Sequence, residues 1–357
     1  MKLKGILIAL FVLGVCFCLF IFCFYKYSLT AVSNDNTEDI IVTIEAGSID
    51  SIGKILKEND LIRNELVFKV YIRLNKINNL QASTYKFNKS MPLEEIISIL
   101  EKGNSYNPDE IMITFKEGKN IRQIATTISE NTNNSYDDVI AKVNNEEYID
   151  SLINKYWFLT NDIKNTKIFY NLEGYLFPDT YAFSSKDVTI ETIIETMLDE
   201  TKNKLDPYKE KVENYNLSIH ELFTLASIVE LESASSSDRK GIAGVFYNRV
   251  EDNWSIGSDV TTYYAWKADK FEVGSLSSDK LNYCDYAYNT RCNSFTGLPV
   301  GPICSPSLES LLASLEPEDH EYYYFVGDCS GKTYFNKTIS GHNNTISKLK
   351  KENNWCA

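Results

Sequence analysis

An uninterrupted apolar segment near the N-terminus constrains this chain more than any other feature. Residues 5–24 (GILIALFVLGVCFCLFIFCF) carry no charge, and twenty helical residues rise about 30 Å, the hydrocarbon thickness of a bilayer. A cleavable signal peptide is the alternative, but its apolar part is usually shorter, and the nearest small-x-small site, Ala31-Val32-Ser33, lies well beyond the segment. We therefore expect an uncleaved transmembrane helix at residues 5–24.

The flanking charges predict how this helix is oriented. Lys2 and Lys4 precede the segment, and acidic residues follow soon after it. Positive residues stay on the cytoplasmic side of a membrane. We expect a cytoplasmic tail at residues 1–4, a polar stalk at residues 25–40, and the remainder of the chain outside the plasma membrane.

Charge and motif content exclude or disfavour several classes of function. The 357-residue chain has a formal net charge of -13 at pH 7 and no run of more than two consecutive basic residues past Lys4. Nucleic-acid binding requires a basic surface, so we exclude it. With three histidines and neither an HExxH nor a CxxC motif, the sequence indicates no metal centre and no cofactor.

Five cysteines lie outside the apolar segment, at positions 284, 292, 304, 329 and 356. An odd number cannot all pair within the chain. Cys284 and Cys292 bracket the short segment CDYAYNTRC and are candidates for a disulfide in an oxidising compartment. Free thiols are the alternative, because spacing does not establish pairing geometry.

The chain from residue 41 onward predicts a mixed α+β fold. Alternating apolar residues predict a strand from Ile41, and apolar residues at helical spacing follow at 49–59 and 66–74. The segment ASTYKFNKS predicts a second strand, and a helix begins after Pro92 and ends at Gly103. This order resembles a LysM-like carbohydrate-binding module, expected at 41–104, although many small α+β units share it.

A weak internal repeat follows. IMITFKEGKNIRQIATTISEN, from Ile111, again predicts a strand, a Glu-Gly turn and an amphipathic helix, and Gly118 corresponds to Gly47. We expect a second strand-helix unit or connector at 105–165. Short motifs rich in Gly, Pro, Asn and aromatic residues begin near residue 166, as expected where loops carry function, so we place an α+β catalytic domain at 166–357.

One predicted helix carries a carboxyl suited to catalysis. Ser218 and Glu221 match a capping box. The residues that would face the core recur at helical spacing: Leu222, Leu225, Ala226 and Val229. The same spacing places Glu232 at the end of this stripe, where partial desolvation favours the neutral form that a general acid needs. The alternative is a helix that simply emerges from the core at its last turn.

Motifs in the second half of the chain resemble the endolytic murein transglycosylases, the MltG or YceG-like family. LEGYLFPDTY resembles the family's LEG-FPDTY segment, and LASIVELESA resembles the ASI-EKE segment whose second acid, the catalytic one, falls on Glu232. The resemblance covers nearly all of residues 166–350. It continues, in order, through DRKGIAGVFYNRV, Ser258-Asp259, AYNT, GLPVGPICSPS, YYYFVGD and TYFNKTISGHN. ELES in place of EKET, and a valine where proline often follows the aspartate, are departures.

The resemblance implies a lytic transglycosylase, a carbon-oxygen lyase that acts within nascent peptidoglycan strands. It cleaves the β-1,4 bond between N-acetylmuramic acid (MurNAc) and N-acetylglucosamine (GlcNAc), leaves 1,6-anhydro ends, and so limits strand length. Glu232 is expected to protonate the glycosidic oxygen and then accept the proton of the C6 hydroxyl. Peptidoglycan synthases of the elongation or division machinery are the implied protein partners.

Further motif residues are expected to bind substrate or support the site. Carboxylates would contact sugar hydroxyls, Tyr181 would stack on a sugar, Asn289 and Thr290 would hold an N-acetyl group, and Arg249 would orient a carboxylate. The full set is Glu173, Asp179, Tyr181, Asn248, Arg249, Asp259, Asn289 and Thr290. A two-carboxylate muramidase, pairing Glu232 with Asp259 or Glu173, and a non-catalytic wall-binding scaffold are the alternatives.

Overall fold

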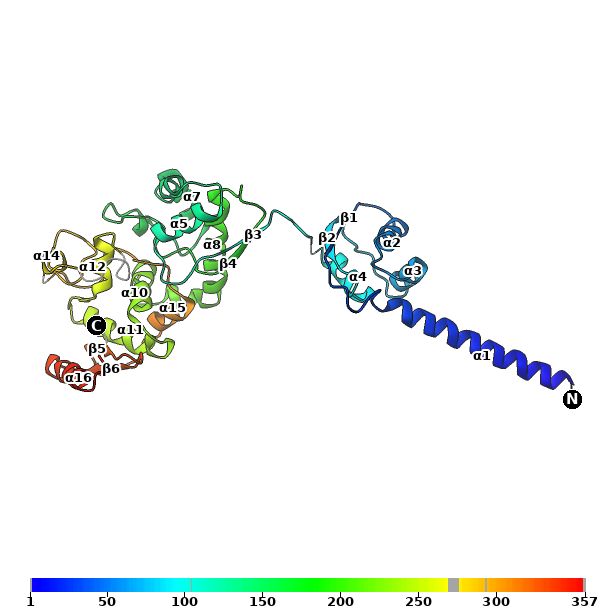
Figure 1. Cartoon of the computed structure of the whole chain (residues 1–357). Helices are drawn as coiled ribbons and strands as arrows, with labels where there is room; N and C mark the ends of the chain where they lie inside the picture. The colour runs from blue at the N-terminus through cyan, green and yellow to red at the C-terminus, as the bar shows by residue number, and fades with distance from the viewer. Residues whose placement is uncertain (1, 104, 269–275, 293, 356–357) are drawn as a thin grey trace. The chain divides into compact units, whose positions relative to one another are not determined.

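The computed structural model describes residues 2–103, 105–268, 276–292 and 294–355. Two compact units divide the chain, Met1–Pro108 and Asp109–Ala357 (Figure 1). Both combine helices with two-stranded antiparallel sheets, as the mixed α+β prediction requires.

The first unit begins with the long apolar helix α1 (Lys2–Leu29). Its segment Ile6–Leu29 is long and apolar enough to cross a membrane, by length and composition. The helix runs past residue 24, so the expected stalk at 25–40 needs correction at its start. Leu29 packs into the core of the unit, and the guanidinium of Arg63 donates to the Tyr27 hydroxyl at 2.7 Å, which ties the end of α1 to the folded unit.

The rest of the first unit follows the order expected from the sequence. The elements are β1 (Ile40–Ile44), α2 (Ile49–Glu58), α3 (Glu65–Leu74), β2 (Ser83–Phe87) and α4 (Leu93–Lys102). Strands β1 and β2 pair antiparallel, with Ile40 opposite Phe87. Alternate side chains of both strands are buried, because successive residues of a strand point to opposite faces. Gly103 ends α4 in the left-handed conformation (φ 67°), which glycine adopts without steric cost.

The second unit starts at residue 109, so the expected boundary between a connector at 105–165 and a domain at 166–357 is not present. Strand β3 (Ile111–Thr114) pairs antiparallel with β4 (Thr180–Phe183). One hydrophobic core also joins both segments, from Ile113 to Leu311. The helices between and after these strands are α5 (Ile121–Asn131), α6 (Tyr136–Val143), α7 (Glu146–Lys155), η1 (Asn161–Lys164) and α8 (Ile190–Leu205).

Helix α10 (Ile219–Glu232) occupies the middle of the second unit (Figure 1). The capping box of Ser218 and Glu221 is formed, as predicted. Helix α10 packs against α11 (Arg239–Glu251), α12 (Asp259–Ala265) and α15 (Leu308–Leu315). Every residue from 222 to 229 is therefore buried, not only the predicted stripe.

Further elements complete the described part of this unit. They are η2 (Asp206–Tyr208), α9 (Lys209–Glu213), η3 (Ser236–Asp238), α14 (Ser278–Leu281), β5 (Tyr324–Gly327), β6 (Thr333–Asn336) and α16 (Ile339–Lys351). The β5–β6 hairpin contacts α16.

Candidate active site

Glu232 is the last residue of α10, and its side chain is partly buried. The hydroxyl of Ser258 donates a hydrogen bond to Glu232 Oε1. Because the buried helix ends here, the carboxyl lies at the boundary between the core and the surface.

Ser258 is itself held from two sides. It is buried, with 3% of its surface exposed, and precedes α12. Its backbone N–H donates to Thr290 Oγ1 at 3.1 Å, and its carbonyl accepts from Thr261 Oγ1 at 2.8 Å. The two threonine hydroxyls also lie 2.7 Å apart. Thr290 therefore fixes the residue that contacts Glu232 and has no exposed surface for an N-acetyl group.

Asn289 anchors the same segment. Its amide nitrogen donates to the carbonyls of Leu281 (3.0 Å) and Tyr283 (2.6 Å), and its oxygen accepts from Thr262 at 2.7 Å. The side chain is fully buried. Asn289, like Thr290, thus contacts protein groups, which favours a positioning role over direct contact with a sugar.

A disulfide joins Cys284 to Cys292, with Cα atoms 5.3 Å apart. This separation is normal for a disulfide. The bond closes the segment that carries Asn289 and Thr290. Cys329 is disulfide-bonded as well, whereas Cys304 is a buried free thiol.

Glu230 has a different environment from Glu232, although it lies only two residues away. Its Oε2 accepts hydrogen bonds from Ser307 N (2.9 Å), Ser307 Oγ (2.6 Å) and Ser310 Oγ (2.7 Å), and Arg239 lies 3.2 Å from Oε1. Burial alone would raise the pKa of Glu230, but the serine hydrogen bonds and the charge of Arg239 together hold it below its ordinary value. Glu230 is therefore an ionised structural group and is unsuited to donate a proton.

Arg249 and Asn248 connect α11 to the segment before β5. The Arg249 Nε donates to the Tyr323 carbonyl at 2.8 Å, and another guanidinium nitrogen donates to the Ile256 carbonyl. Burial lowers the pKa of Arg249, and the nearby charge of Glu232 partly offsets this. Asn248 donates to the carbonyls of residues 320 and 322. Arg249 therefore lies close enough to influence Glu232 electrostatically, while its described hydrogen bonds hold backbone in place.

Glu173 is buried away from solvent, with 1% of its surface exposed. Its carboxylate accepts from the N–H of Ile121 at 3.0 Å, at the start of α5, and from the Tyr264 hydroxyl at 2.8 Å. Burial raises the pKa of Glu173 to about 8.

The next residue, Gly174 (φ 85°), needs to be glycine because a Cβ there would lie 2.4 Å from Pro302. The LEG motif thus joins α5, α12 and the 297–307 segment.

Three other expected site residues lie in separate environments. Tyr181 lies on β4 and is 8% exposed. Its ring packs near Phe115 and its hydroxyl donates to the Phe177 carbonyl. Tyr181 therefore belongs to the core and is not placed to stack on a sugar. Asp179 is exposed just before β4. Asp259 begins α12 and pairs with Arg291 at 2.5 Å.

Sequence reasoning missed the direct partners of both acids on α10. Ser258 belongs to the Ser258-Asp259 motif, but nothing in that motif indicates that it pairs with Glu232. Ser307 and Ser310 gave no signal beyond the SPS motif and a helix start. A local pattern cannot pair residues 26 positions apart, as Ser258 and Glu232 are, or about 80 apart, as Glu230 and the two serines are.

A cavity of about 230 Å³ lies beside α10, next to the residue that precedes Glu232. Leu231, Val260, Tyr263 and Ile303 contribute apolar wall, and Gly118 and Lys119 come from the loop before α5. Gly118 (φ 72°) lies so close that a Cβ there would be 3.2 Å from Leu231 Cδ2. This mix of aromatic, apolar and polar groups is typical of a small-molecule or sugar site.

Comparisons with known proteins agree on one family. The model of the YceG-like family matches residues 42–348. The endolytic murein transglycosylase of Bacillus subtilis (strain 168) is 36% identical over 329 residues, which are 92% of this chain and 89% of that protein. The endolytic murein transglycosylase of Streptococcus pneumoniae serotype 2 (strain D39 / NCTC 7466) is 33% identical over 341 residues, 91% of this chain and 61% of that longer protein.

A solved structure is also similar. The crystal structure of a YceG-like protein from Listeria monocytogenes matches with a TM-score of 0.61 and 34% sequence identity. The match covers 86% of this chain and 99% of that one.

Proposed function

Because this chain belongs to the YceG-like family, we propose that it is an endolytic murein transglycosylase in which Glu232 is the catalytic acid and base. It cleaves the β-1,4 bond between MurNAc and GlcNAc within nascent glycan strands. The observation that carries the assignment of Glu232 is the contrast between the two acids of α10. Glu230 is ionised and enclosed by serines and an arginine, whereas Glu232 is the partly buried last residue of the helix and follows Leu231, which lines a cavity.

The proposed chemistry needs one carboxyl. Protonated Glu232 donates to the glycosidic oxygen as the bond to the muramic acid C1 breaks. The resulting carboxylate accepts the proton of the C6 hydroxyl, whose oxygen bonds to C1 and closes the 1,6-anhydro ring. No water is consumed, and the carboxyl returns to its protonated state. The hydroxyl of Ser258 supports this cycle by fixing the side-chain direction of Glu232.

The test uses the full chain in detergent with purified glycan strands and identifies new ends by mass spectrometry. We expect 1,6-anhydro ends from the wild type and none from Glu232→Gln. Glu251→Gln, which alters an exposed carboxyl at the end of α11, is the matched control and should retain activity.

Each alternative predicts a different product. Reducing ends would indicate a muramidase and a second carboxylate. Cleavage by Glu232→Gln would show that another residue is the acid. Strand binding without cleavage by the wild type would indicate a scaffold.

Two further parts of the proposal concern the first unit. We propose that residues 41–104 form a LysM-like unit that binds glycan, supported by the order β1, α2, α3, β2. We also propose that α1 anchors the chain, supported by its apolar composition, with residues 1–4 in the cytoplasm, supported by Lys2 and Lys4 before the apolar segment. Protease protection of an N-terminal tag in intact cells tests this orientation.

We also propose that peptidoglycan synthases are partners, because the substrate strands emerge from them. Crosslinking in cells followed by mass spectrometry tests this.

A further inference from the structure

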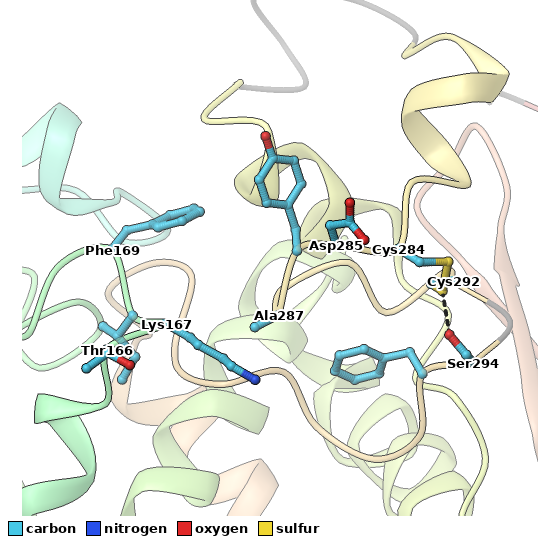
Figure 2. Close-up of a pocket in the computed structure, with 11 residues that line it drawn as sticks. Thr166, Lys167, Phe169, Cys284, Asp285, Ala287, Cys292 and Ser294 are labelled. Carbon is cyan, nitrogen blue, oxygen red and sulfur yellow. Dashed lines mark hydrogen bonds between the residues drawn. A yellow bond between two sulfur atoms is a disulfide. The ribbon is translucent and has the colours of Figure 1, made fainter.

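A second cavity, of about 550 Å³, is lined in part by the disulfide-closed segment (Figure 2). One wall is formed by residues 166–169 and the other by residues 284–287, with Cys292, Ser294 and Phe295 completing it. This volume falls in the range of small-molecule sites. The aromatic rings of Phe169, Tyr286 and Phe295 supply apolar surface.

Two opposite charges face this cavity from opposite walls. The side chain of Lys167 is exposed and extends into the cavity (Figure 2). Within the residues that the structure describes, its ammonium makes no ion pair or hydrogen bond. Asp285 lies on the other wall and accepts a hydrogen bond from Tyr283. In a protein of net charge -13, an unpaired lysine in an aromatic-lined cavity is a candidate binding group for an anion.

The position of the cavity relative to Glu232 can be estimated along α10. A Cβ at Gly301 would lie 3.2 Å from His220 Nε2 and 3.3 Å from Ile168 Cδ1, so the cavity wall at residue 168 is next to the start of α10. Glu232 is twelve residues further along this helix, about 18 Å at 1.5 Å per residue. An extended pentapeptide spans about 17–18 Å.

We propose that this cavity binds the C-terminal end of the peptide stem carried by the muramic acid at the cleavage site. The ammonium of Lys167 binds the terminal carboxylate, the rings of Phe169 and Phe295 contact the methyl groups of the terminal alanines, and Asp285 binds the free amine of the diamino acid. A crosslinked stem lacks one of these charged groups, so the cavity selects strands with complete, uncrosslinked stems. The inference rests on the proposed function because it takes peptidoglycan as the substrate.

The first test measures binding, which does not depend on cleavage. The probe is the pentapeptide L-Ala-γ-D-Glu-L-Lys-D-Ala-D-Ala, titrated into the full chain in detergent by calorimetry. We expect the wild type to bind the pentapeptide saturably. Lys167→Met should bind it about fivefold to tenfold more weakly, because it loses one charge-assisted hydrogen bond at an exposed site. Lys186→Met, an exposed lysine outside the cavity, is the matched control. The absence of saturable binding by the wild type, or equal binding by both variants, overturns the inference.

The second test measures cleavage of two substrates. On strands with pentapeptide stems, Lys167→Met should have a fivefold to tenfold higher KM and an unchanged kcat, because the contact is far from the reacting bond. On strands stripped of stems by an amidase, Lys167→Met should equal the wild type. Equal losses on both substrates overturn the inference. A wild type that cleaves neither substrate but binds the pentapeptide refutes the proposed function and leaves the binding site supported.

Discussion

Replacing Glu230 by glutamine tests the different roles that the structure gives to the two acids of α10. The Glu230 carboxylate is 7% exposed and accepts three hydrogen bonds from Ser307 and Ser310, while Arg239 lies 3.2 Å away. Glutamine keeps one oxygen that can accept, but it removes the charge and turns an amide N–H₂ group toward the guanidinium of Arg239. We therefore expect Glu230→Gln to reduce the free energy of unfolding.

The magnitude follows from the contacts. Hydrogen bonds to charged groups contribute about 1.5–3 kcal/mol, against about 0.5–1.5 kcal/mol for neutral ones. Weakening three such bonds therefore costs about 3 kcal/mol, and breaking a buried ion pair costs about 3–5 kcal/mol. Because these terms share one carboxylate, we expect a total loss of about 3–4 kcal/mol. For a domain of about 150–250 residues this lowers Tm by about 6–16 °C.

The assay is thermal unfolding of the full chain in detergent, followed by near-UV circular dichroism at pH 7. Glu232→Gln is the matched variant, two residues away on the same helix, and we expect its Tm to stay within about 3 °C of the wild type while its activity is lost. The lowered pKa of Glu230 means that the carboxylate stabilises the fold above the ordinary pKa of 4.5 and stops doing so as pH falls through the lowered value. The difference between wild type and Glu230→Gln should therefore shrink in acid.

Two results would refute this reasoning. One is a Glu230→Gln protein that unfolds at the wild-type temperature. The other is loss of cleavage in a stable Glu230→Gln protein together with activity in Glu232→Gln, which would exchange the roles of the two acids.

Other testable features are the Ser258–Glu232 hydrogen bond, the buried Glu173, the disulfide and helix α1. Ser258→Ala should lower kcat about tenfold, the effect of one hydrogen bond to a charged group, while Ser258→Thr keeps most of the rate. Burial raises the pKa of Glu173 to about 8 from an ordinary 4.5. Between these two pH values the folded state keeps a proton that the unfolded state loses, so the free energy of unfolding should fall as pH rises from 4.5 to 8. Urea unfolding at pH 5 and 8 should show this decline in the wild type and not in Glu173→Gln. Replacing Cys284 and Cys292 by serine should lower the free energy of unfolding by about 2–3 kcal/mol. It should also slow cleavage, because the segment that the disulfide closes holds Ser258; an unchanged cleavage rate would contradict this. A chain lacking residues 1–24 should leave the membrane fraction on cell fractionation; its retention there would argue against α1 as the anchor.

The features that the sequence determined by itself are those governed by local interactions. The apolar helix, the strands and helices of the first unit, and the capping box that starts α10 depend on residues a few positions apart. Local spacing is sufficient for these because backbone hydrogen bonds and side-chain periodicity repeat within one element. The candidate acid Glu232 was also identifiable, from helical spacing and from a family motif.

Only the tertiary structure decided how residues from distant segments combine. The strand β3 pairs with β4 across about 70 residues, so residues 109–165 belong to the second unit despite resembling the first. Ser307 and Ser310, about 80 positions from Glu230, make that acid structural, and Ser258 contacts Glu232 instead. The expected sugar contacts Asn289 and Thr290 are buried; Thr290 bonds Ser258, and Asn289 bonds Thr262 and the carbonyls of Leu281 and Tyr283. Local pattern cannot supply such information, because desolvation and hydrogen bonding of a side chain depend on whatever the fold packs against it.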